Sequence, residues 1–162
     1  MPYMQTSMQC VVRLVASRGL CAAQRSQCQA LRAEAGRLWT DLVRLHTQAR
    51  DEGRWLSAGE LEQATKGGQY ALHSQSVQAL CQKFAANLDT ATELRRQELA
   101  ETGYIQTRYP HHPKVYQTVI WKDQALTVLP NGLLRLPTGG QHPPLLRHCQ
   151  RNIVRPIYVG PS

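Results

Sequence analysis

Cations and aromatic rings alternate between residues 104 and 122, and this pairing of side chains is suited to binding nucleic acid. Lys and Arg release condensed counterions when they neutralise phosphates, and aromatic rings stack on unpaired bases. Arg95 and Arg96, shortly before this segment, extend the same basic run. The predicted phosphate contacts are Arg95, Arg96, Arg108, Lys114 and Lys122, and the predicted stacking residues are Tyr109 and Trp121.

Each of these residues also has an ordinary structural explanation. Alternation along residues 115–121 places Trp121 on one face of a strand and Tyr116 on the other, and a strand buries one face in the core. Because both faces cannot be core, we expect some of these rings to be exposed beside the cations. Arg95 and Arg96 have a second explanation as favourable charges near the C-terminus of a helix.

Charge divides the chain into two unequal parts. Residues 1–102 contain 12 Lys and Arg and 10 Asp and Glu, whereas residues 103–162 contain 7 and 1, so the net charges are +2 and +6. Asp123 is the single carboxylate of the second part. A basic excess of this kind favours a phosphate-bearing partner, and the alternative is a soluble domain that happens to be basic.

Catalytic and metal-binding patterns are missing from the sequence. Paired-metal phosphoryl chemistry needs several converging carboxylates, and ten of the eleven acids precede residue 103. His111 and His112 are adjacent and would point apart on an extended chain, although His142, His148 and Cys149 have the right chemistry to approach a metal. We therefore expect no catalytic residue, no metal and no cofactor, and a small hydrolase has no supporting constellation.

The five cysteines form no C-x-x-C pair and are odd in number, which is atypical of a zinc ribbon or a disulfide framework and favours a reducing cytoplasm. No run of about 18 apolar residues is present, so we expect no membrane span.

Periodicity predicts the elements that position these residues. Residues 8–16 alternate as a first strand. Helical periods follow over 22–50, in a short helix capped by Ser57 and Glu60, and from Ser74 or Ser76 to 102, with the two long helices antiparallel. Further strands are predicted at 115–121, 125–129, 133–136 and 153–159, and Asn131-Gly132 is a hairpin turn signal.

The order of elements therefore predicts an α+β protein in which a helical insertion follows the first strand. Residues 1–19 and 103–162 form the β domain, and residues 20–102 form the insertion. If the barrel is incomplete, the strand 153–159 presents an unpaired edge, which predicts self-association through that edge.

Residues 108–126 and 131–137, with the preceding helix from residue 72, resemble the OrfB/TnpB family of transposon-encoded proteins, long described as transposases and related to type V CRISPR effectors. The most specific part is Tyr109-Pro110, Lys114, Tyr116 and Val119-Ile-Trp-Lys122. His111-His112-Pro113 departs from the more basic and aromatic residues usual in the family.

The resemblance implies an oligonucleotide-binding-type partial β-barrel, the wedge domain, interrupted by a helical recognition insertion. Family members use this half to hold a guide RNA and to read a short DNA motif, and they cut DNA with a later RuvC-like domain. We therefore expect a non-catalytic amino-terminal fragment that binds RNA or DNA. The alternative is a helical protein-interaction module without nucleic-acid function, which would not need the +6 charge of the β part.

Overall fold

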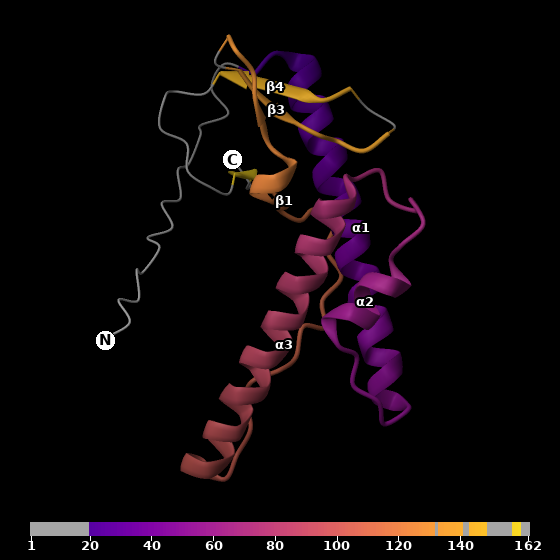
Figure 1. The fold of residues 1–162 in the computed structure, drawn as a ribbon. Helices are drawn as coiled ribbons and strands as arrows, with labels where there is room; N and C mark the ends of the chain where they lie inside the picture. The colour runs from indigo at the N-terminus through magenta and orange to yellow at the C-terminus, as the bar shows by residue number, and fades with distance from the viewer. Residues whose placement is uncertain (1–19, 132, 141–142, 149–156, 160–162) are drawn as a thin grey trace, which may run out of the picture.

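The computed structural model describes residues 20–131, 133–140, 143–148 and 157–159, which form an α+β fold (Figure 1). The fold class is therefore confirmed, whereas the predicted first strand, 8–16, lies outside the described residues. Within the described residues, three helices are followed by five short strands and one 3-10 turn. The elements are α1 (Ala22–Asp51), α2 (Ala58–Ala64), α3 (Ser74–Thr102), β1 (Val119–Trp121), η1 (Asp123–Ala125), β2 (Thr127–Val128), β3 (Leu133–Leu136), β4 (Leu145–His148) and β5 (Ile157–Val159).

The two long helices run in the same direction, so the prediction of an antiparallel pair is wrong. In Figure 1, α1 starts at the top and α3 starts below the strands, and both run towards the lower end. Trp39 of α1 contacts Phe84 of α3 edge to face, with ring centroids 5.1 Å apart. Eleven residues further along each helix, Arg50 and Arg95 lie over the same tyrosine ring. The helices are parallel because the segment between them carries the chain back along α1.

This returning segment contains α2, whose start is the capping box that the sequence predicts. The amide of Glu60 donates to the Ser57 hydroxyl, and the Glu60 carboxylate accepts from the Ser57 amide at 2.8 Å. Beyond α2, Tyr70 donates a 2.8 Å hydrogen bond to Asp41 of α1. The N-cap of α3 is His73, one residue before Ser74 and three before Ser76, the two predicted caps, and the helix ends at Gly103 with φ of 69°.

The strands form two small antiparallel sheets. One has the order β2-β3-β4, and the other pairs β1 with β5. The hairpin between β2 and β3 is confirmed, but Leu129 pairs with Leu133, so three residues rather than two separate the paired positions. The sequence missed β4 inside the segment that follows the predicted loop, and β1 covers only the end of the predicted strand 115–121.

The core joins both parts of the chain. Val119, Ile120 and Trp121 of β1 are all buried, because this strand packs on α3 and α1. Leu134 and Leu136 of β3 are buried on the inner face of the β2-β3-β4 sheet. Within the described part of the chain, no helix has the length and apolar character needed to cross a membrane.

Gly36 in the middle of α1 marks the place where the later chain crosses this helix. A Cβ atom at Gly36 would collide with the backbone of Val115 and would lie 2.7 Å from the Lys114 carbonyl oxygen. A glycine in a helix costs about 1 kcal/mol relative to alanine, so its presence in α1 needs a packing reason. The close approach of residues 114 and 115 supplies that reason.

Candidate nucleic-acid interface

Residues 107–114, which we call the strap, run back along α3 after the chain turns at Gly103. Glu98 fixes the start of the strap, because its carboxylate accepts hydrogen bonds from the Gln106 amide at 2.8 Å and from the Thr107 amide at 2.9 Å. These bonds and the Thr107 hydroxyl lower the pKa of Glu98, with the hydroxyl as the largest cause. Arg95 donates to the Thr107 carbonyl oxygen at 2.6 Å.

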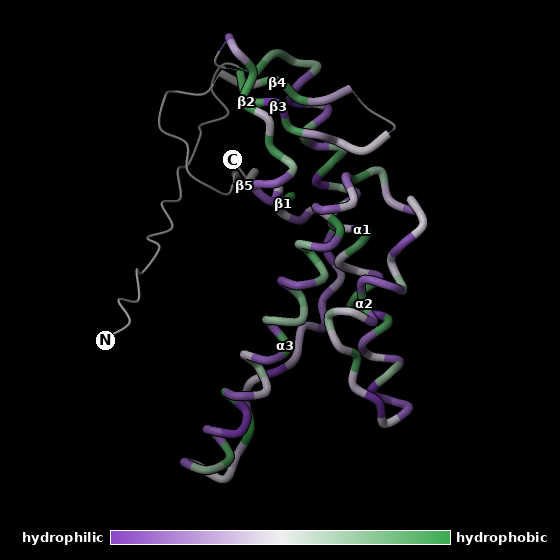
Figure 2. Tube along the Cα trace, in the orientation of Figure 1, coloured by the Kyte–Doolittle hydropathy of each residue, from purple (hydrophilic) through white to green (hydrophobic). Residues whose placement is uncertain are grey.

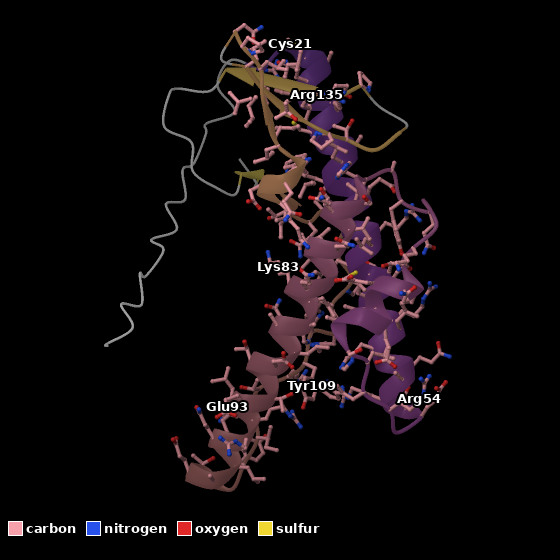
Figure 3. The ribbon with its side chains drawn as sticks, in the orientation of Figure 1. Cys21, Arg54, Lys83, Glu93, Tyr109 and Arg135 are labelled. Atoms are coloured by element: carbon pink, nitrogen blue, oxygen red, sulfur yellow. The ribbon has the colours of Figure 1, made fainter. Side chains whose placement is uncertain are left out.

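Tyr109 holds the middle of the strap between α3 and the end of α1 (Figure 3). The Arg50 and Arg95 guanidinium carbons lie 4.6 and 4.8 Å from its ring centroid. Its ring also contacts His46 and Trp55 edge to face, with centroids 5.9 and 5.2 Å away. Tyr109 therefore has a packing role, and its ring is already engaged by two cations and two aromatic rings.

The far end of the strap is fixed to α1. The Lys114 amide donates to the Thr40 hydroxyl at 3.1 Å, next to the crossing at Gly36. The Lys114 ammonium lies 4.5 Å from the centroid of the Trp39 ring. A cation over an indole face is attracted by the ring quadrupole, so this contact orients the Lys114 side chain.

Between the strap and α3 lies a groove of about 460 Å³, which we call the strap groove. Its α3 wall has an apolar part at Ala91 and Leu94, and Arg108 and Lys114 bring two positive charges from the strap. None of the described residues that line it carries a carboxylate. The lining residues are Trp39, Asn87, Thr90, Ala91, Leu94, Thr107, Arg108, Tyr109, Pro110, His111, His112 and Lys114.

The structure brings together some of the predicted contact residues and separates others. Arg108, Tyr109 and Lys114 line the strap groove, whereas Arg95 does not line it and lies over the Tyr109 ring. Arg96 is exposed on α3, where it forms an ion pair with Glu93 at 2.8 Å.

Trp121 and Lys122 lie apart from the groove, at β1 and at the start of η1. Trp121 is 1% exposed and donates to the Pro137 carbonyl oxygen at 2.6 Å. A buried indole has no free face for a base, so the prediction of Trp121 as a stacking residue is wrong. Trp121 is buried rather than exposed because both faces of β1 are covered by the core.

Sequence reasoning also misjudged the histidine pair. The His111 and His112 rings do not point apart, because their centroids are 3.9 Å apart with an interplanar angle of 41°. The chain bends at Pro110, directly before these residues, whereas the prediction assumed an extended chain. In the residues that the structure describes, no group of three metal-ligating side chains is present, and the side chains of His142, His148 and Cys149 lie outside them.

Lys83 is a residue of this region that the sequence analysis did not select. It is half-buried on α3, and burial together with the neighbouring Lys114 ammonium lowers its pKa. Its spacing becomes informative once the groove is known, because Lys83 lies four residues before Asn87 and so shares a helix face with it.

Comparison with known proteins found no match: no family model, no curated protein and no solved structure is significantly similar to this chain.

Proposed function

We propose that this chain binds nucleic acid through the strap groove and has no catalytic role of its own. The observation that carries the proposal is the charge of the groove: Arg108 and Lys114 line it together with two histidines, and its described lining residues include no acid. Side chains of one sign around a hollow concentrate ligands of the opposite sign. Phosphate groups fit such a lining, and the apolar part of the wall suits a base.

The finer proposal is that the chain has the role of the guide-RNA-binding and target-DNA-binding amino-terminal part of a TnpB-like protein. The order of elements supports it, since a helical lobe of residues 20–102 precedes the strand-bearing residues 103–159. In this proposal the strands belong to a wedge-type barrel. Self-association through the last strand remains a prediction, to be measured by sedimentation; β5 pairs with β1 on one edge.

The test is fluorescence anisotropy with a 12-nucleotide single-stranded RNA between 25 and 200 mM salt. We expect weak binding, with a logarithm of the association constant that falls linearly with the logarithm of the salt concentration. The double variant Arg108→Glu/Lys114→Glu should lower affinity at least about tenfold, because it reverses both groove cations.

The matched control is Arg135→Glu/Lys66→Glu, which makes the same change in net charge at two exposed residues outside the groove. Figure 3 shows Arg135 near the top of the molecule and Tyr109 in its lower half. Absence of salt-dependent binding by the unaltered chain contradicts the proposal. Equal losses in the two double variants would show that binding follows net charge rather than the groove.

A second candidate, the helical protein-interaction module, is favoured by one observation. The last turns of α3 extend beyond the other helices and are mostly hydrophilic (Figure 2), yet Leu94 and Leu99 there are 44% and 54% exposed. Tyr104, just after the helix, is 66% exposed. Leu99→Ser/Tyr104→Ser separates the two candidates, because it leaves the groove cations intact and should not change RNA affinity.

A further inference from the structure

The groove wall on α3 continues beyond the residues that line the groove. Asn87, Thr90, Ala91 and Leu94 recur at spacings of three or four, which places them on one helix face. Lys83 lies one turn before Asn87 on that same face. With a rise of 1.5 Å per residue, the face from Lys83 to Leu94 is about 16 Å long.

Lys83 and Lys114 place two like charges at one end of this face, because Lys114 lies over Trp39, and the Trp39 ring contacts Phe84, the residue next to Lys83. The Lys114 ammonium lies 4.5 Å from the centroid of the Trp39 ring, and burial, followed by the Lys114 charge, lowers the pKa of Lys83. Among the described residues, neither ammonium forms an ion pair or a hydrogen bond. Two like charges kept together repel each other, and a bound anion removes that repulsion.

Arg108 provides positive charge at the other end of the groove. It follows Thr107, which Arg95 and Glu98 fix one turn beyond Leu94. Cations therefore lie at the two ends of the groove, and Ala91 and Leu94 provide apolar surface between them. This alternation of charge and apolar surface matches a chain of phosphates joined by nucleosides.

We propose that Lys83 and Lys114 form a phosphate subsite at one end of the strap groove, and that its ligand is a backbone phosphate of single-stranded nucleic acid. This inference rests on the proposed function. It adds that the bound nucleic acid is single-stranded and that Lys83, which does not line the groove, contacts one of its phosphates. A groove of about 460 Å³ is the size of a small-molecule pocket, so it admits unstacked nucleotides and excludes a double helix.

The experiment compares Lys83→Gln with Lys66→Gln, since both remove one positive charge and Lys66 is exposed outside the groove. Lys83→Arg is the charge-retaining variant. The first probe is a fluorescein-labelled 12-nucleotide single-stranded RNA, with a duplex of the same length as competitor. We expect Lys83→Gln to weaken binding about threefold to tenfold and to reduce the salt slope by about 0.7, as for one lost phosphate contact on a single strand.

The second readout is the melting temperature without RNA. Lys83→Gln should raise the melting temperature, because it removes the repulsion with Lys114, and Lys66→Gln should not. A residue with a purely structural role would lower stability and binding together. Inorganic pyrophosphate should raise the melting temperature of the unaltered chain and of Lys66→Gln, but not that of Lys83→Gln.

The outcomes separate this inference from the proposed function. Binding of RNA that is equally strong in Lys83→Gln and Lys66→Gln overturns the subsite and leaves the proposed function standing. Equal affinity for duplex and single strand overturns the strandedness. Absence of RNA binding by the unaltered chain overturns the proposed function. If pyrophosphate then still raises the melting temperature in a Lys83-dependent way, the result supports a phosphate subsite for a small ligand. Binding to phosphatidylserine vesicles in place of RNA would overturn the nucleic-acid assignment.

Discussion

The helical residues 20–102 and the strand-bearing residues 103–159 are stabilised in different ways. The helices bury apolar stripes against one another, as Leu42 of α1 and Leu80 of α3 show with exposures near zero. In the strand-bearing part, β1 is three residues long and its burial comes from α3 and α1. Strands this short cannot form an independent core, so the second part depends on the first.

The two parts share one core, and removing a large ring from either side should break it. Phe84→Ala and Trp121→Ala each delete a fully buried aromatic ring, and such changes cost about 3–5 kcal/mol. We expect each variant to unfold in a single transition with a lower urea midpoint, as monitored by far-UV circular dichroism. A Trp121→Ala variant in which the helical signal keeps its original midpoint would show that the strand-bearing part unfolds separately.

The contact at Gly36 is the next largest test, because it joins the two parts through backbone alone. Gly36→Ala gains about 1 kcal/mol of helix propensity, but its Cβ collides with residues 114 and 115, and overpacking costs about 1–3 kcal/mol. Because the obstacle is backbone, we expect a net decrease in the free energy of unfolding. Gly59→Ala in α2 is the control, since the nearest atom to its new Cβ is 4.0 Å away, and it should increase that free energy. An increase in both variants would mean that the crossing chain moves aside easily.

The sequence predicted the helices better than the strands for a physical reason. The stripe that includes Phe84 and Leu88 is a local pattern, so it located α3 almost to the residue. The direction of α3 relative to α1 depends on how far residues 52–73 return along α1, which local periodicity does not encode. Trp121 was misplaced for the same reason, since burial of both strand faces is set by distant helices.

The groove was predictable only in part. Arg108 and Lys114 stood out because they lie in a basic segment close together in the sequence. Lys83 is far from them along the chain, and only the crossing of the strap over α1 and α3 brings Lys114 near it.

Lowering the pH should destabilise the contact between the two parts at His46, which is 1% exposed and packs against Tyr109. Neither of its ring nitrogens has a hydrogen-bond partner among the described residues, and its neighbours are Trp55, Phe84, Tyr109 and the cation Arg50. Burial, followed by the Arg50 charge, lowers the pKa of His46 below its ordinary 6.5. Above about pH 6.5 both folded and unfolded states are neutral, so the stability is complete.

Below that pH the unfolded chain binds the proton first, and the free energy of unfolding falls by up to about 1.4 kcal/mol per pH unit until the lowered pKa is reached. Chemical denaturation between pH 5 and 8 measures this slope. His46→Phe should flatten it, because an apolar ring of similar shape replaces an unsatisfied buried polar group. His112→Gln changes an exposed ring and should leave the slope as it is, and a slope that persists in His46→Phe would assign it to another group.

The smallest effect is expected at the start of the strap, where α3 extends past the core and polar bonds replace apolar packing. Glu98→Gln keeps the shape of the side chain but removes the charge that three donors from Gln106 and Thr107 share. We expect faster hydrogen exchange at these two amides, with α3 before Ala91 unchanged. Glu101→Gln is the control, because Glu101 is exposed and has no such bonds.

In the unaltered chain the same amides should stay protected above about pH 4.5 and lose protection as pH falls through the lowered pKa of Glu98. Equal exchange in the two variants would mean that Tyr109 and its two arginines hold the strap without Glu98, so that packing fixes the groove even where the helical core has ended.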